Sequence, residues 1–258
     1  MNDHLAPDWR PLLAARGLDD FDTLWHLEAD WFEPPNQRRG GWSGVVYLSL
    51  DDGSGGRRGL FLKRQENHTR KTWRHPIARE PTFRAEARNL RLLEKRGIPA
   101  PRLVFYAERR TPAGWRVILA TAELEGFMPL DRWLAAPTGG ARARHRLTVA
   151  IARLLRRFHA LGQAHNALHA KHIFVDPAGG RAALIDLEKM RPRLTRRQAM
   201  LRDLDSLNRH SFHTSRSDRL RFLLAYLDKP RANRRVRALW RRLAAMAERK
   251  QRRKKRAS

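Results

Sequence analysis

The chain changes its hydrophobic periodicity part-way along, and this change limits the folds that it can adopt. Two β-branched and aromatic runs, residues 45–50 and 60–63, flank a glycine-rich turn at 51–59 and predict a β-hairpin. Residues 81–96 then follow a helical pattern that stops at Gly97, with two prolines close beyond it. The first part of the chain therefore predicts strands followed by one helix.

The pattern after these elements becomes mainly helical. Two more strands are predicted at 103–107 and 115–122, and residues 121–126 then interrupt the pattern as a linker. Residues 145–161 place apolar side chains at spacings of three and four, which predicts a long amphipathic helix. A second hairpin is predicted from the short runs at 173–175 and 182–187, and most of the remaining chain has a helical pattern.

Charge and cysteine content exclude several classes of protein. The 258 residues include 54 Lys and Arg against 26 Asp and Glu, so the formal net charge is +28, and 45 of the cations are Arg. This charge favours polyanionic partners, namely nucleic acid, an anionic membrane leaflet or a phosphorylated glycolipid, although codon bias alone also explains the Arg excess. The absence of Cys excludes disulfides, thiolate zinc sites and a catalytic thiol.

The sequence contains neither a secretory signal pattern nor a membrane-spanning run. Asp3, Pro7 and Asp8 interrupt the region where a signal peptide needs its apolar stretch. The longest apolar runs, such as 117–122, are much shorter than the roughly 20 residues that cross a bilayer. We therefore expect a protein that is soluble or peripheral to a membrane.

Three segments of the second half carry a family resemblance. They are HNALHAKHIFV at 165–175, LIDLEK at 184–189 and RDLDSLN at 202–208, and they follow a glycine-rich hairpin, a strand lysine and a helix glutamate. This order resembles the lipopolysaccharide kinase family, bacterial enzymes that phosphorylate Kdo or heptose in the inner core, and within it the InaA-like branch. The resemblance covers about residues 38–227.

The resemblance implies an α+β, protein-kinase-like bilobal fold with a small β-rich N-lobe and a mostly helical C-lobe. The expected organisation is an N-terminal extension at 1–36, a nucleotide-binding N-lobe at 37–122, a C-lobe with the catalytic loop and metal site at 123–230, and a basic C-terminal helix and tail at 231–258.

The same resemblance implies ATP as a cofactor and places its site mainly in the N-lobe. Lys63 is expected to hold the α- and β-phosphates, with Glu86 as its orienting ion-pair partner in preference to Glu80. The glycine loop with Gly41 and Gly44 either brings backbone N–H groups to phosphate or forms a plain hairpin turn. Glu123, in the linker, is also assigned to the nucleotide site.

Magnesium is the second implied cofactor. Asp186 lies between apolar residues, where an unpaired carboxylate is costly, so a bound cation is expected to balance its charge. His172 stands where protein kinases carry a second metal-binding Asn, and it either binds metal or only hydrogen-bonds the loop. The resemblance therefore implies that Asp186 is a metal ligand, and His172 is the second candidate ligand.

The catalytic loop departs from the family pattern. His165-Asn166-Ala167 stands where the proven kinases have His-Arg-Asp, and Ala167 cannot accept a proton. His169, Asp203 or the substrate itself is the conceivable substitute for the missing base. His165 and Asp203, together with Arg202, are also expected to brace the loop. Activity is thus in question, whereas binding of nucleotide and metal is expected.

These residues support two functions and disfavour a third. The first is an ATP-dependent kinase of lipopolysaccharide core sugars at the cytoplasmic face of the inner membrane. The alternative is a catalytically degenerate relative that binds nucleotide or anionic glycolipid in a regulatory or stress role. Nucleic acid is the least favoured partner, because no helix-turn-helix, zinc or aromatic RNA-binding signature accompanies the charge.

The basic C-terminal segment has two interpretations. Its apolar residues Val236, Leu239, Trp240, Leu243 and Met246 fall on one side of a helix. That side either lies in an anionic membrane surface or packs on the C-lobe, and the chain from Glu248 onward is expected to be a solvated tail.

Overall fold

The computed structural model describes residues 3–38, 40–72, 75–210 and 214–255. The chain forms two compact units. The first comprises residues 1–95 and 101–125, and the second comprises 96–100 and 126–258. Residue 39 of the predicted glycine loop and residues 256–258 of the predicted tail lie outside the described residues.

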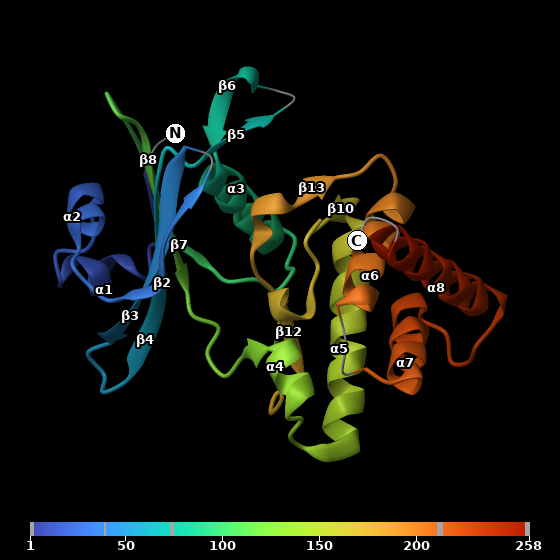
Figure 1. Cartoon of the computed structure of the whole chain (residues 1–258). Helices are drawn as coiled ribbons and strands as arrows, with labels where there is room; N and C mark the ends of the chain where they lie inside the picture. Colours follow the sequence, from blue (N-terminus) through green and yellow to red (C-terminus); the bar gives the residue numbers. More distant parts are fainter. Residues whose placement is uncertain (1–2, 39, 73–74, 211–213, 256–258) are drawn as a thin grey trace. The chain divides into compact units, whose positions relative to one another are not determined.

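A six-stranded antiparallel sheet forms the framework of the first unit (Figure 1). The hairpin predicted around the glycine-rich turn is confirmed, since Val46 pairs with Leu62 and Tyr47 with Phe61. In spatial order the strands are β1 (His4–Leu5), β7 (Leu103–Thr111), β8 (Gly114–Ala122), β4 (Arg57–Glu66), β3 (Gly41–Asp51) and β2 (Trp31–Arg38).

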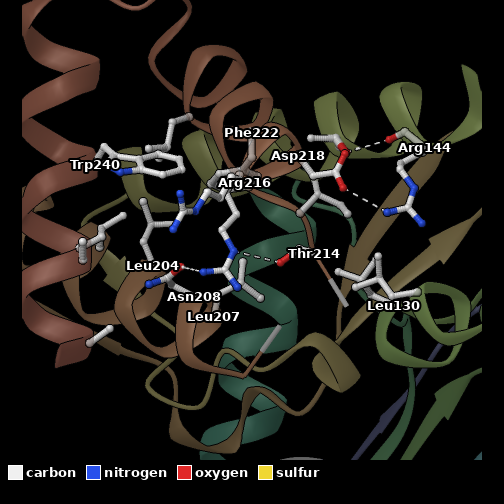
Figure 2. A pocket seen from close by; sticks show the side chains of 18 of the residues that line it. Leu130, Arg144, Leu204, Leu207, Asn208, Thr214, Arg216, Asp218, Phe222 and Trp240 are labelled. Carbon is white, nitrogen blue, oxygen red and sulfur yellow. Dashed lines mark hydrogen bonds and ion pairs between the residues drawn. The ribbon is translucent and has the colours of Figure 1, made fainter. Parts of the chain in front are cut away.

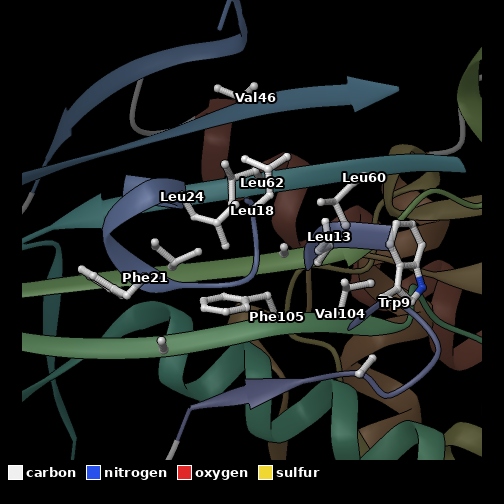
Figure 3. Close-up of a cluster of buried hydrophobic side chains, with 14 of the residues drawn as sticks. Trp9, Leu13, Leu18, Phe21, Leu24, Val46, Leu60, Leu62, Val104 and Phe105 are labelled. Carbon is white, nitrogen blue, oxygen red and sulfur yellow. The ribbon is translucent and has the colours of Figure 1, made fainter. Parts of the chain in front are cut away.

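Two short N-terminal helices pack on one side of this sheet. They are α1 (Arg10–Ala14) and α2 (Phe21–His26), and the Asp20 side chain caps α2 by accepting hydrogen bonds from two backbone N–H groups. Figure 3 shows their side chains gathered with those of β3, β4 and β7; the buried cluster includes Trp9, Leu13, Phe21, Leu24, Val46, Leu60, Leu62, Val104 and Phe105. The segment expected to be an extension therefore forms part of the core.

Strand β2 contains Pro34 and Pro35, where the extension was expected to end. Proline lacks a backbone N–H, so a strand tolerates it mainly at a sheet edge or a bulge. Strand β2 meets both conditions, because it is the outermost strand and its register with β3 shifts between Trp31 and Asn36.

One helix completes the first unit, as predicted. Helix α3 (Thr82–Lys95) follows a two-stranded ribbon of β5 (Thr69–Thr72) and β6 (His75–Pro81). Its buried side includes Phe83, Glu86 and Leu90.

The second unit is built mainly of helices. The long helix predicted at 145–161 is confirmed as α5 (Gly140–Ala160), which buries Leu147, Ile151, Leu155 and Phe158. The other helices are α4 (Leu130–Ala135), α6 (Arg196–Arg209), α7 (Arg216–Leu227) and α8 (Arg234–Lys255).

Short strands in this unit carry the loops that matter for function. The predicted second hairpin is confirmed by the pairing of β11 (Ile173–Asp176) with β12 (Arg181–Leu184), and β9 (Met128–Pro129) pairs with β11. Strand β10 (Gln163–Ala164) pairs with β13 (Arg191–Pro192). The run expected to continue to residue 187 ends as a strand at Leu184, because Asp186 adopts a left-handed backbone and residues 187–189 form a 3₁₀ turn.

Helix α8 buries its apolar side within the second unit. Val236, Leu239 and Leu243 are buried, and the helix contacts α6 and α7. This favours the interpretation of the segment as a helix packed on its own domain. The helix also continues past Glu248 to Lys255, where a solvated tail was expected, and Lys250 Nζ lies 2.5 Å from Asp205 Oδ2. Within the described ranges, no helix is both long and apolar enough to cross a bilayer.

Candidate functional site

Lys63 and Glu86 form an ion pair in the first unit. Lys63 lies in β4, opposite Val45 of β3 and Leu119 of β8. Its Nζ is 2.6 Å from Glu86 Oε1 on the buried side of α3, and the two side chains are 22% and 5% exposed. Glu80, the alternative partner, lies instead 3.1 Å from Arg88. The pair holds a partly exposed ammonium group in one position.

Packing within the first unit explains why Gly41 and Gly44 of the predicted loop are glycines. Gly41 begins β3, and a Cβ there would lie 2.0 Å from the carbonyl oxygen of Glu66. A Cβ on Gly44 would lie 2.6 Å from the Trp31 ring, which covers that position. Close approach by backbone or an aromatic ring therefore accounts for both glycines without a ligand.

Glu123 is engaged with the end of the sheet. Its backbone N–H donates to Gly59 O at 2.9 Å, and its Oε2 accepts a hydrogen bond from the Tyr47 hydroxyl at 2.7 Å. This hydrogen bond to a carboxylate raises the pKa of Tyr47, because it stabilises the protonated phenol. The carboxylate lies over Gly59, where a Cβ would be 1.8 Å from Oε2.

Asp203 fixes the start of the catalytic loop in the second unit. It lies on α6 and is fully buried. Its carboxylate accepts hydrogen bonds from the backbone N–H groups of His165 at 2.6 Å and Asn166 at 2.9 Å, and from His159 Nε2 at 3.2 Å. Three donors on one buried carboxylate satisfy its charge and hold the loop against α6.

Asn166 links the catalytic loop to two neighbouring segments. It has a left-handed backbone with φ of 64°, a conformation that Asn tolerates better than most residues. Its Nδ2 donates to Ala164 O and Lys189 O, and its Oδ1 accepts from Arg202 Nε at 2.8 Å and from Arg193. From the sequence, Asn166 was considered only as the residue that stands where the proven kinases have Arg. An Asn in a loop is, however, itself a signal of a turn with a left-handed residue.

Histidine rings stack along the catalytic loop. His172 stacks on His165 and on His169, with centroid distances of 5.8 and 5.5 Å, and His210 lies 4.1 Å from His169. Burial, followed by repulsion from neighbouring cationic groups, lowers the pKa of His169 to about 4. His169 is therefore neutral near pH 7 and has a lone pair that can accept a proton.

His165 is fixed more tightly than His169. It is fully buried, and Nε2 donates to Ile185 O at 2.8 Å, since a carbonyl oxygen only accepts. Burial lowers the pKa of its ring. These contacts tie the catalytic loop to the residue just before Asp186.

Asp186 and His172 lie side by side. Asp186 Oδ2 is 3.3 Å from His172 Nε2, and the left-handed backbone at Asp186 has φ of 56°. His172 Nδ1 lies 2.7 Å from Ala167 O and must donate to it, so Nε2 of the neutral ring is an acceptor. The 3.3 Å contact is satisfied either by a proton on Nε2, which gives an ion pair with Asp186, or by a cation bound to both groups.

The described residues contain no cluster of three or more His, Asp or Glu side chains arranged for a metal ion. Magnesium does not require such a cluster, because it usually takes one or two carboxylates together with substrate phosphates and water. The Asp186 carboxylate fits this smaller requirement, and His172 lies beside it.

Comparison with known proteins identifies the family. A model of the Lipopolysaccharide kinase (Kdo/WaaP) family matches residues 22–226. The chain belongs to this family. It is 31% identical over 196 residues to Protein InaA of Escherichia coli (strain K12), a match that covers 74% of this chain and 88% of InaA.

A solved structure supports the fold. WaaP, determined in complex with acyl carrier protein, superimposes with a TM-score of 0.66 at 24% identity, covering 97% of this chain and 98% of that chain. The kinase-like α+β fold and the family resemblance predicted from the sequence are therefore confirmed.

The second unit of this lipopolysaccharide kinase family member also contains a cavity of about 740 Å³ (Figure 2). Its walls are mainly apolar and come from α4 to α8, including Leu130, Phe222 and Trp240. Polar groups on the walls contact one another, since Arg144 lies 3.1 Å from Asp218 and Arg219 donates to Asn208. None of the predicted site residues lines this cavity.

Proposed function

We propose that this chain binds ATP with Mg²⁺ and transfers a phosphoryl group to a Kdo or heptose hydroxyl of the lipopolysaccharide core. The Lys63–Glu86 ion pair is the observation that carries this proposal. Phosphoryl transfer depends on positioned positive charge more than on covalent chemistry. A lysine held by a buried glutamate meets the α- and β-phosphates with little loss of side-chain freedom. Gly41, Gly44 and Glu123 line the same nucleotide site in this proposal.

Asp186 is the main metal ligand in this proposal, and His172, 3.3 Å away, is the second ligand. The carboxylate supplies the hard oxygen that Mg²⁺ prefers, and the facing Nε2 acceptor is consistent with a cation at this point. When bound, Mg²⁺ neutralises phosphate oxygens as negative charge develops on them. Asn166 and His165 keep the Asp186 segment in register with the catalytic loop.

His169 is the proton acceptor that we favour over Asp203. The Asp203 carboxylate is fully buried and already accepts three hydrogen bonds, so it is a positioning group. His169 is partly exposed, lies two residues after Ala167 and has a lowered pKa. Such a weak base suffices where the transition state is loose and demands little proton transfer.

A catalytically degenerate protein is the second candidate. It is favoured by Ala167, because the side chain at this position is a buried methyl group that cannot accept a proton. The backbone carbonyl oxygen of Ala167 accepts a hydrogen bond from His172. Loss of a general base costs about 10² to 10⁴ in rate. In this alternative the same residues bind nucleotide or an anionic glycolipid, and the protein serves a regulatory or stress role.

The partners in our proposal follow from charge and family. A net charge of +28 favours the phosphates and acidic sugars of the lipopolysaccharide inner core, and a peripheral position on the anionic cytoplasmic face of the inner membrane. WaaP has been solved in complex with acyl carrier protein, and we include that protein as a partner to be tested by co-purification. Nucleic acid is not among the partners that we propose.

Nucleotide binding tests the site assignment. Lys63→Ala and Asp186→Ala should each abolish magnesium-dependent ATP binding measured by calorimetry. Lys229→Ala and the exposed Asp19→Ala are the matched controls and should leave the affinity unchanged. Wild-type affinity in both site variants would contradict the assignment.

Turnover separates the two candidate functions. Phosphate transfer to purified core oligosaccharide should be measurable in the wild type and should fall in His169→Ala. Ala167→Asp restores the carboxylate and should raise the rate if the wild type is limited by its base. A silent wild type that Ala167→Asp does not rescue would favour the degenerate protein.

A further inference from the structure

The loop between β13 and α6 carries an unusual combination of side chains. Residues 191–197 read RPRLTRR, and Arg191, Arg193, Arg196 and Arg197 are all exposed. Leu194 at the centre is 94% exposed, against 60% for Phe32, the next most exposed large apolar side chain among the described residues. We call residues 191–197 the arginine loop.

Both ends of the arginine loop are anchored. Strand β13 pairs with β10, Arg193 N donates to Gly162 O at 2.9 Å, and Met190 just before the loop is buried. At the other end Thr195 caps α6 by accepting from Gln198 N at 3.1 Å, and Ala199 is buried. The loop therefore presents Leu194 to solvent from a fixed base.

Folding does not explain why Arg196 and Arg197 are placed here. Arg196 and Arg197 occupy the first turn of α6, where the helix dipole disfavours positive charge, and that turn has no acidic residue. For Arg193, Arg196 and Arg197, the described part of the chain supplies no ion-pair partner. An exposed leucine next to Arg196 and Arg197 suits the surface of an anionic bilayer, which carries negative charge outside and is apolar beneath.

We propose that the arginine loop docks the protein on an anionic phospholipid bilayer, with Leu194 inserted below the headgroups. This inference rests on the peripheral membrane position in the proposed function and names the surface responsible. Each arginine near an anionic leaflet strengthens binding about fivefold, and burial of a leucine adds about tenfold.

The arginine loop suits this role better than α8. Helix α8 has more basic residues, but its apolar residues Val236, Leu239 and Leu243 are buried against the rest of the second unit. A membrane-binding helix needs its apolar face free for the acyl boundary. In the arginine loop, by contrast, the apolar side chain is the exposed one.

The arginine loop is connected to the catalytic loop by hydrogen bonds. Arg193 and Arg202 both donate to Asn166 Oδ1, and Asn166 N donates to Asp203. Arg193 therefore links the docking surface to Asn166, the residue before Ala167. Docking at the arginine loop would therefore place the membrane beside the catalytic loop of the second unit.

A label at position 194 tests insertion directly. The chain has no Cys, so Leu194→Cys supplies a unique thiol for an environment-sensitive fluorophore in the full-length protein. With vesicles of phosphatidylcholine and phosphatidylglycerol, the emission should shift to the blue and increase, and with phosphatidylcholine alone it should not. Phe32→Cys, labelled in the same way, is the control and should not respond. An unchanged emission from position 194 on vesicles that sediment the protein would overturn the proposal.

Sedimentation with the same vesicles separates this surface from general charge. Arg196→Glu/Arg197→Glu should lower vesicle binding at least about 25-fold, whereas Arg241→Glu/Arg242→Glu on α8 makes the same charge change and should lower it much less. Leu194→Ser keeps the charge and should lower binding about tenfold. Equal losses in the two arginine pairs, or retention of an RNA oligonucleotide but not of vesicles, would overturn the proposal.

Vesicle binding and ATP binding are measured separately, so failure of the docking proposal and failure of the kinase proposal give different results. Lys63→Ala should lose ATP binding and keep vesicle binding. Loss of vesicle binding in the arginine-loop variants with intact ATP binding would confirm docking as a separate property. Vesicle binding without ATP binding in the wild type would instead contradict only the kinase proposal.

Discussion

Single residues set the geometry of the catalytic loop, and Asp203 does so most directly. Its carboxylate is fully buried and accepts hydrogen bonds from two successive backbone N–H groups and from His159. The sequence indicated this bracing role through the Arg202-Asp203 segment. Spacing alone did not show that both carboxylate oxygens accept hydrogen bonds, which is why our proposal gives Asp203 a positioning role.

Asp203→Asn should destabilise the second unit. The amide nitrogen would face donors in place of an acceptor, leaving buried N–H groups unsatisfied, so the free energy of unfolding should fall by roughly 2–4 kcal/mol. Urea denaturation followed by circular dichroism measures this. The exposed Asp19→Asn is the control and should change the value by less than about 0.5 kcal/mol. A loss no larger than that of the control would show that the loop does not depend on Asp203.

Gly44 allows a test between packing and phosphate binding. Gly44→Ala should cost about 1–3 kcal/mol of unfolding free energy, because its Cβ would lie 2.6 Å from the Trp31 ring. In a Trp31→Ala background only the Glu33 carbonyl oxygen, at 3.3 Å, remains close to the added methyl group, and the further cost should fall below about 1 kcal/mol. Thermal unfolding gives the stabilities, and ATP titration of the double variant shows whether Gly44 also serves the nucleotide. An equal cost in both backgrounds would exclude Trp31 as the reason for glycine.

Helix α7 begins with a capping box, in which Ser215 and Asp218 each accept a hydrogen bond from the other's backbone N–H. Ser215 Oγ accepts from Asp218 N at 3.1 Å, and Asp218 Oδ2 accepts from Ser215 N and Oγ. Asp218 also lies 3.1 Å from Arg144 of α5, so the cap connects two helices that pack on each other.

Ser215→Ala should lower stability by about 1 kcal/mol through loss of this cap. The neighbouring Ser217→Ala is exposed inside the helix and should be neutral or slightly stabilising, since Ala is the better helix former. Differential scanning calorimetry of both variants makes the comparison. Equal melting temperatures for the two would contradict a capping role.

Periodicity predicted the central elements well, and the reason is burial. The β3–β4 hairpin, α3 and α5 each bury one regular face, so apolar spacing records their structure. Strand β2 was missed because an edge strand with two prolines has no such pattern. The end of β12 was misplaced because the left-handed turn at Asp186 depends on the surrounding loops.

The order of motifs along the chain predicted the family and the fold, whereas contacts between residues far apart in the sequence were seen only in the structure. The Lys63–Glu86 pair was accessible from the sequence, because a strand lysine and a helix glutamate recur in this order. The position of Asn166 between Lys189, Arg193 and Arg202 was not, since no local pattern encodes these three partners. The same holds for the stacked histidine rings.

The first 38 residues supply both outermost strands of the sheet, β1 and β2. A shortened protein that starts at residue 39 would therefore leave the backbone N–H and C=O groups of β7 and β3 unpaired on both margins of the sheet, and uncover Leu60 and Phe105. Unpaired margins of this kind recruit other chains by strand addition. We expect such a protein to elute as aggregates in size-exclusion chromatography, because the N-terminal residues protect both margins of the sheet.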